Sequence, residues 1–288
     1  MSETASAADP AAALDGDAAR HHRPGQWFLR PLAIPLAVVV LAALGAGDTA
    51  VDLERRLLPP SPGRWLGTDQ LGRDILGRLV DGAGWTVGVG LGATLLAFAI
   101  GCAVGILAVE GGPLVRRGAL QLVALVQGFP ALVVALGAVA SLGQGAVTVI
   151  LVLGLFGWPV FARVLAAEAA EALQRDYVLA ARIAGVRPVS LYLRHLLPAV
   201  APSLGGLFLF HFADMLVAAS ALAFLGVGAP LGFPAWGAML SESRAYLHDA
   251  PWMMLAPAAA LAGTVLAVNR LGEALAGRLA GRSGDGRR

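Results

Sequence analysis

Six apolar stretches dominate this sequence, and each is close in length to a helix that crosses a bilayer. Such a helix needs about 20 residues, with a usual range of about 17 to 25. Only 14% of the 288 residues are charged, whereas a soluble domain commonly carries about 25%. The chain is therefore predicted to be an all-α, polytopic membrane protein with six transmembrane helices. The predicted spans are residues 27–47, 84–109, 118–142, 147–164, 199–223 and 251–268.

The segments around these spans define the predicted domain organisation. Residues 1–26 are rich in Ala, Asp, Ser and Gly and are predicted to be a disordered cytoplasmic tail. Residues 48–82 are polar and proline-rich and form the predicted extracytoplasmic loop. Residues 83–275 make up a transmembrane domain of five spans, followed by a basic cytoplasmic tail at 276–288. The span at 27–47 is predicted to be a retained anchor. A cleavable signal peptide is the alternative, because basic residues precede a short apolar core.

The basic residues predict the orientation of the chain in the membrane. All 21 basic side chains are arginine, and they cluster between the apolar stretches. If both termini lie in the cytoplasm, most of these arginines fall in cytoplasmic segments, as the positive-inside rule requires. This pattern fits membrane topology better than a surface that binds nucleic acid. The chain is therefore expected to be a multi-pass protein of the cytoplasmic (inner) membrane.

The absence of lysine limits the chemistry that this chain can perform. A P-loop needs a lysine to reach the phosphates of a nucleotide, so no such site can exist here. Any ATP must be hydrolysed by another chain, and no bound cofactor is expected in this one. The five histidines are scattered and no HExxH motif occurs, so neither a metal site nor a catalytic site is predicted.

Glycines recur at four-residue intervals in the second predicted span. Gly84, Gly88 and Gly92 form one such series, and Gly101 and Gly105 continue the spacing. Residues four apart share a helix face, where small side chains let two backbones approach closely. The partner helix belongs either to this chain or to a second subunit, and the sequence leaves both open.

The segment between the fourth and fifth spans has the pattern of two short amphipathic helices. Gly185 separates them, and Pro188 suits the first turn of the second helix. Pro198 marks the start of the fifth span. These residues predict a compact cytoplasmic elbow, through which a separate motor protein could move the membrane helices.

This elbow resembles the "EAA" loop of ABC importer permeases. Ala180, Ala181 and Gly185 match the loop, whereas Leu179 holds the position of the family's glutamate. The stretch 66–74, LGTDQLGRD, is similar to a signature of the dipeptide, oligopeptide and nickel importer permeases, in the second of their two permease types. Further matches in the same order are Phe129–Pro130, Gly157–Pro159, residues 224–228, residues 234–240 and Pro251–Trp252.

The resemblance implies a transport function and a set of partners. It implies a permease without its own ATPase site, which moves peptides or nickel and metallophore-type solutes by alternating access. The implied partners are a second permease in a heterodimer, two ATP-binding subunits and an extracytoplasmic solute-binding protein. The residues implied in coupling to the ATPase are Asp176, Tyr177, Ala180, Ala181, Arg182, Gly185, Val186 and Pro188.

Two other classes of protein remain as alternatives. An ATP-independent secondary transporter or channel would be expected to show inverted repeats, and the sequence has no convincing internal repeat. A membrane-embedded enzyme would need polar residues that converge within the membrane, and only His211 and Asp214 are candidates.

His211 and Asp214 lie within the fifth predicted span. The family often has a glutamate and a serine in this span, where this chain has Ala219 and Ala223. An ionisable residue within a membrane helix costs roughly 2.5 to 3.5 kcal/mol on insertion, so it is expected to face protein or water. Two interpretations follow. The pair lines the translocation path and contacts a polar or cationic group of the cargo, or it forms a self-satisfied hydrogen-bonded pair that fixes helix packing.

The charged residues of the LGTDQLGRD stretch also allow two interpretations. Asp69, Arg73 and Asp74 could form an ordinary charged surface helix with an i, i+4 ion pair. Alternatively, they have a structural role near the extracytoplasmic mouth, because they immediately precede a membrane span.

Overall fold

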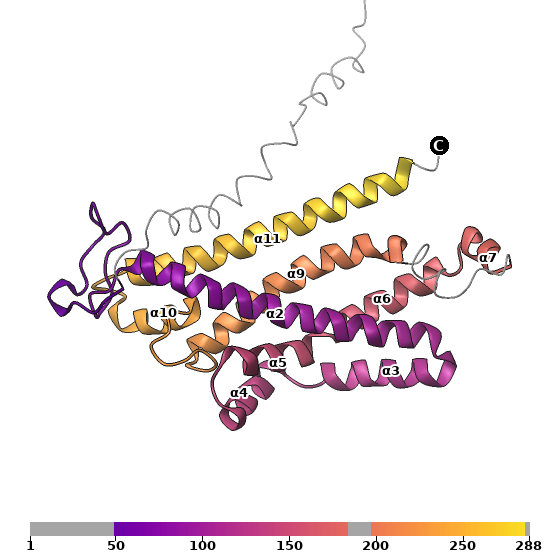
Figure 1. The fold of residues 1–288 in the computed structure, drawn as a ribbon, viewed down its shortest axis with the longest axis horizontal. Coiled ribbons are helices and arrows are strands. Elements are labelled where there is room, and N and C mark those ends of the chain that lie inside the picture. Colours follow the sequence, from indigo (N-terminus) through magenta and orange to yellow (C-terminus); the bar gives the residue numbers. More distant parts are fainter. Residues whose placement is uncertain (1–48, 184–196, 286–288) are drawn as a thin grey trace, which may run out of the picture.

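The computed structural model describes residues 49–183 and 197–285, and the regular structure of these residues is helical apart from two isolated β-bridges (Figure 1). The elements are η2 (Leu53–Arg55), α2 (Ile75–Glu110), α3 (Gly112–Gln127), α4 (Ala131–Leu142), α5 (Ala146–Gly157), α6 (Pro159–Ala172), α7 (Asp176–Ile183), α9 (Leu197–Phe224), α10 (Trp236–Ser243), η4 (Arg244–Tyr246) and α11 (Trp252–Asp285).

Four helices in the described part of the chain are long and apolar enough to cross a membrane. They are α2, the run Ala146–Ala172 formed by α5 and α6, α9 and α11. The pair α3 and α4 would make a fifth span, and its two helices are bent by 77°. The predicted all-α membrane fold is therefore confirmed. The predicted span at 27–47 lies outside the described residues.

Proline residues interrupt two of the predicted spans. The span expected at 118–142 is a bent pair, because α3 ends at Gln127 and α4 begins only after Pro130. The span expected at 147–164 is divided at Trp158, and Pro159 opens α6. Proline lacks an N–H group and its ring collides with the preceding turn, so it bends or ends a helix. The membrane-length apolar runs therefore contain two breaks that hydropathy alone does not predict.

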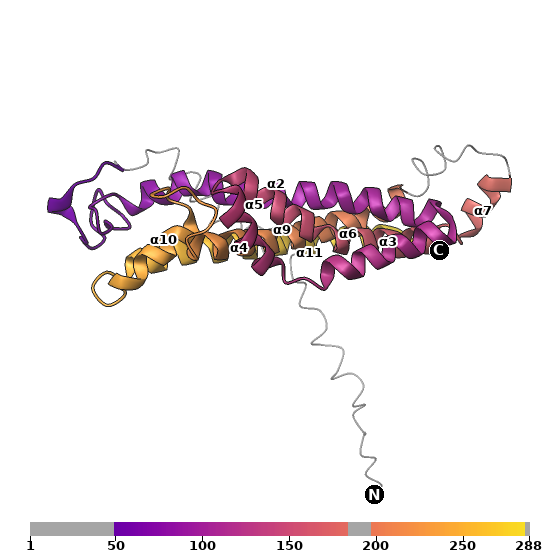
Figure 2. The same ribbon diagram turned by 90° about the horizontal axis from the view of Figure 1, so that it is seen from below.

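The long helices α2, α9 and α11 run side by side along the molecule, as both views show (Figures 1 and 2). The loop at 49–74 and α10 lie at one end, and α7 lies at the other. One apolar cluster joins α2 to α5 and α9 through Val89, Leu153 and Leu222. Polar segments thus cover both ends of an apolar bundle, which is the layout that a bilayer requires.

The boundaries of α2 and α11 differ from those expected. Asp74 caps the N-terminus of α2, and its Oδ2 accepts a hydrogen bond from the Gly77 N–H at 2.8 Å. The predicted loop at 48–82 therefore ends at Asp74. The last helix continues to Asp285, through most of the segment predicted as a tail at 276–288.

The glycines of α2 divide into two groups. A Cβ atom on Gly101 would lie 2.5 Å from the Phe161 Cβ, and one on Gly105 would lie 3.0 Å from the Leu165 Cβ. A Cβ on Gly92 would lie 2.9 Å from the Ile150 Cδ1 of α5. These glycines therefore allow α2 to approach α5 and α6 of the same chain. By contrast, a Cβ on Gly84 or Gly88 would meet nothing within 4 Å. Packing within the subunit explains the first group and leaves the second without a neighbour in the described structure.

Candidate translocation site

A cavity of about 450 Å³ lies where the two interrupted spans meet the middle of α9. Its lining comes from the ends of α3 and α5, the starts of α4 and α6, and one face of α9. The lining residues are Gln127, Ala131, Leu132, Leu153, Phe156, Gly157, Pro159, Val160, His211, Asp214, Met215 and Ala218. The structure therefore brings both predicted path residues, His211 and Asp214, to one cavity.

His211 is held in a narrow space beside the break between α5 and α6. Only 8% of the residue is exposed, and its ring meets that of Phe161 edge to face, with 4.9 Å between the ring centroids. A Cβ on Gly157 would lie 2.7 Å from the Nε2 atom of His211. A larger residue at position 157 would therefore displace the imidazole. The Nε2 atom has no hydrogen-bond partner within residues 49–183 and 197–285.

Asp214 is exposed on α9, one turn after His211. Within the described ranges, its carboxylate makes no hydrogen bond or ion pair, and none joins it to His211. The geometry therefore does not show the self-satisfied pair that the sequence allows. Ala219 and Ala223, which replace the polar residues of the family pattern, are buried. Within the described part of the chain, the polar side chains that line this cavity are those of His211, Asp214 and Gln127.

The side chains of this cavity are suited to the recognition of a bound molecule. It offers one negative charge, one imidazole ring and the amide of Gln127 within a lining that is otherwise apolar among the described residues. Among the described residues, no group of three His, Cys, Asp or Glu side chains is placed to hold a metal ion.

The predicted coupling residues lie partly on α7, at the end of the molecule away from α10 (Figure 1). Asp176, Tyr177, Ala180, Ala181 and Arg182 belong to this helix. Asp176 and Ala180 are exposed. The other predicted coupling residues, Gly185, Val186 and Pro188, lie outside the described residues.

Two residues that the sequence analysis did not select define the two faces of α7. Val178 is buried and anchors the helix, whereas Ile183 is 89% exposed. Ile183 follows Ala180 by three positions, so the two share a helix face. The sequence contained a signal for this face, because Ile183 is an aliphatic residue three positions after Ala180. That spacing becomes informative only once the helix is known.

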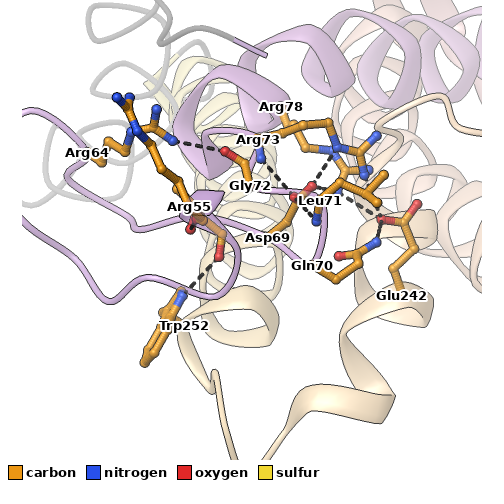
Figure 3. A network of polar contacts seen from close by, with 11 residues as sticks. Arg55, Arg64, Asp69, Gln70, Leu71, Gly72, Arg73, Arg78, Glu242 and Trp252 are labelled. Atoms are coloured by element: carbon orange, nitrogen blue, oxygen red, sulfur yellow. Dashed lines mark hydrogen bonds and ion pairs between the residues drawn. The ribbon is translucent and has the colours of Figure 1, made fainter. Parts of the chain in front are cut away.

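The LGTDQLGRD stretch forms a buried polar network at the opposite end (Figure 3). Asp69 is 1% exposed and Arg78 is 3% exposed. Asp69 Oδ2 accepts hydrogen bonds from Arg73 Nε at 2.7 Å and Arg78 Nη1 at 2.8 Å. Asp69 Oδ1 accepts two more from the backbone N–H groups of Leu71 and Arg73. A single carboxylate thus fixes the turn and binds two guanidinium groups.

Glu242 on α10 completes this network. Its Oε2 accepts from Arg78 Nη1 at 2.8 Å and from Gln70 Nε2 at 3.1 Å, and it lies 3.5 Å from Arg73 Nη2. The predicted i, i+4 pair of Asp69 and Arg73 is therefore present, but it lies in a buried turn before α2. The structure therefore does not show the charged surface helix of the first interpretation. The network ties the loop at 49–74 to α2 and α10, which matches the predicted structural role.

Comparison with known proteins identifies the family. The family of binding-protein-dependent transport system inner membrane components matches residues 93–281. The nickel transport system permease protein NikC of Escherichia coli (strain K12) is 32% identical over 256 residues, which are 87% of this chain and 92% of NikC. The glutathione transport system permease protein GsiD of Pectobacterium atrosepticum is 33% identical over 224 residues, 78% of this chain and 74% of GsiD.

The fold has a counterpart among solved structures. A chain of the MetNI methionine ABC transporter, in an inward-facing conformation, matches with a TM-score of 0.57 and 19% sequence identity. The match covers 70% of this chain and 95% of that one. The fold, the family match and the relatives agree: the chain belongs to the family of binding-protein-dependent transport system inner membrane components.

Proposed function

We propose that the cavity around His211 and Asp214 is part of the translocation path of an ATP-driven importer. Family membership makes the chain a permease subunit of an ABC importer. The observation that carries the assignment of the path is the position of the cavity, at two helix breaks beside the middle of α9. Irregular backbone is tolerated at membrane depth where it is buried in protein or lines a water-filled space.

The helix breaks support alternating access. A bend of 77° separates α3 from α4 before Pro130, and a one-residue interruption at Trp158 separates α5 from α6 within the single run Ala146–Ala172. Pieces that meet at such breaks can tilt without disrupting a continuous helix, and this allows a cavity to open to one side of the membrane at a time. In this proposal, α7 transmits the motion of the ATPase to α6 and α9.

The partners and cargo follow from the family and the named relatives. The family implies ATPase and binding-protein subunits. We further propose a heterodimer with a second permease, two ATPase subunits that hydrolyse the ATP, and both termini of this chain in the cytoplasm. Relatives named for nickel and for glutathione transport support small peptides or nickel and metallophore-type complexes as the cargo class.

Co-purification and reconstitution test this function. The tagged chain is solubilised from its native membrane, and the chains recovered with it are identified by mass spectrometry. The complex is then placed in liposomes with its binding protein, and uptake is measured with ATP and with a non-hydrolysable analogue. We expect P-loop ATPases, a second permease and ATP-dependent uptake. Uptake by the purified chain alone would instead establish the ATP-independent carrier.

Replacing Ile183 with glutamate is expected to uncouple transport from ATP hydrolysis. The exposed apolar face formed by Ala180 and Ile183 is the surface that α7 offers to an ATPase partner. A buried charge without a partner weakens such a contact by several kcal/mol. Uptake and substrate-stimulated ATPase activity are therefore expected to fall at least tenfold, with normal membrane insertion.

Two variants separate coupling from folding. Ile183→Leu retains the apolar surface and is expected to restore uptake. Val178→Ala weakens the anchor of α7 and is expected to reduce stability as well as uptake. Normal coupling in Ile183→Glu would show that this face of α7 does not contact the motor.

A further inference from the structure

We propose that Asp214 and His211 form a recognition point for the positively charged part of the cargo, either a protonated amine or a metal complex of net positive charge. The inference rests on the proposed path and adds the charge of the group that the path accepts. Two independent features carry it: an unpaired carboxylate in an apolar cavity, and a buried ring nitrogen without a partner beside it.

The charge of the cavity is the first feature. Among the residues that the structure describes, Asp214 is the only acidic residue in the lining, and none of the lining residues is an arginine. No cation within residues 49–183 and 197–285 lies within ion-pair distance of its carboxylate. Low-dielectric walls concentrate the field of such a charge in the cavity. The site therefore attracts cations and repels anions before any specific contact forms.

The unpartnered ring nitrogen is the second feature. His211 is 8% exposed and its Nε2 atom has no partner in the described structure. The atom is closed off from the cavity, because it faces the backbone of Gly157. An unsatisfied buried polar atom destabilises the protein by about 1 to 3 kcal/mol, so it favours a conformation of the path in which a group of the cargo reaches the ring. The edge-to-face contact with Phe161 positions the imidazole, and Gly157, which has no side chain, leaves room for it.

Together, the two groups suit a compact cation with more than one site for bonding. A protonated amine can donate one hydrogen bond to the carboxylate and another to a neutral ring nitrogen. A metal complex can present its net charge to Asp214 and an exchangeable site to the imidazole. Both cargo types share one chemistry, a positive charge near hydrogen-bond donors or an open coordination position.

Thiol labelling tests the charge of the cavity without knowledge of the cargo. Ala218 lines the cavity one turn after Asp214, so Ala218→Cys provides a reporter in a background in which the single native cysteine is removed (Cys102→Ala). The complete complex is labelled with a trimethylammonium and with a sulfonate methanethiosulfonate reagent, and each rate is divided by the rate with a free thiol. At a separation of about 6 Å in water, Coulomb attraction and repulsion together favour the cation about tenfold.

The expected result is a preference of that size, which disappears in Asp214→Asn. Asp81→Asn removes an exposed acid of α2 outside the cavity and serves as the matched control, with the preference retained. An equal preference in the Asp214→Asn protein would contradict the inference. So would a sulfonate reagent that reacts as fast as the ammonium reagent while Asp214 is present.

Uptake by proteoliposomes supplies the second arm and separates the two proposals. The substrates tested are a lysine-containing dipeptide, the same dipeptide with both amino groups acetylated, glutathione, and Ni²⁺ with and without free histidine. Asp214→Asn and His211→Gln are expected to reduce uptake of the cationic cargo at least tenfold relative to the acetylated dipeptide. The dipeptide and nickel arms distinguish an amine from a metal complex. Absence of ATP-dependent uptake in the wild-type complex would contradict the proposed function, whereas unchanged cargo preference in an active Asp214→Asn importer would contradict this inference alone.

Discussion

Replacing Asp69 with asparagine is expected to destabilise the protein by about 3 to 5 kcal/mol, because it breaks a buried ion-pair network by removing one charge. Asp69 binds Arg73 and Arg78 through one oxygen. Without it, Glu242 is the only remaining carboxylate of the network, and it is partly exposed. The side chain of Arg78, which is 3% exposed, then retains one charged partner. The loop at 49–74 is expected to separate from α2 and α10.

The measurement is thermal unfolding of the detergent-solubilised complex, together with limited proteolysis of the loop. Glu171→Gln provides the matched control, since it removes a carboxylate from an exposed pair with Arg175 at 3.4 Å and such pairs contribute about 1 kcal/mol or less. We expect a large fall in melting temperature and rapid cleavage near residues 49–74 for Asp69→Asn alone. Equal stability of the two variants would show that the network does not hold the loop.

Replacing Gly101 with valine is expected to destabilise the contact between α2 and α6 by about 3 kcal/mol, the upper part of the usual range for overpacking. A Cβ at this position would lie 2.5 Å from the Phe161 Cβ and 2.6 Å from the Trp158 carbonyl oxygen. The carbonyl belongs to the backbone at the α5–α6 break and cannot rotate away. The helices must therefore separate, and His211 loses its contact with Phe161.

Gly84→Val is the matched control for this prediction. A Cβ on Gly84 would meet nothing within 4 Å, so the stability of this chain is expected to change little. Unfolding of the detergent-solubilised complex measures both variants, and equal destabilisation would contradict the packing argument. Co-purification of the second permease adds a separate result. If Gly84→Val no longer co-purifies with the second permease, the face of α2 that carries Gly84 and Gly88 contacts that partner. This is the alternative that the sequence left open for these glycines.

The sequence predicted the membrane fold because apolar length is a direct consequence of bilayer thickness. It also placed His211 and Asp214 on one helix face, since a separation of three residues fixes that relation. It did not predict the bend after Gln127 or the break at Trp158. Hydropathy averages over a window, and a single proline barely changes that average while it removes a backbone hydrogen bond.

Prediction of the site would have required the contacts between residues far apart in the chain, and no local sequence pattern contains them. The hydrogen bond between His211 and Asp214, one of the two interpretations that the sequence allowed, is not formed among the described residues, and the imidazole packs against Phe161. The network of Asp69 with Glu242 joins residues far apart in the chain. Helical and turn patterns report on neighbours a few positions apart, so the ion pair with Arg73 could be anticipated but burial by α10 could not.

The most direct test of the central claim is the accessibility of position 218 during ATP turnover. The Ala218→Cys reporter, in the Cys102→Ala background, is placed in liposomes within the complete importer and labelled from the extracytoplasmic side with a membrane-impermeant thiol reagent. Labelling is compared with and without trapped ATP. If the cavity is the alternating path, labelling from this side increases when ATP is trapped, and the bulky adduct blocks uptake. Identical labelling in both states, in an importer that still couples ATP hydrolysis to uptake, would contradict this account.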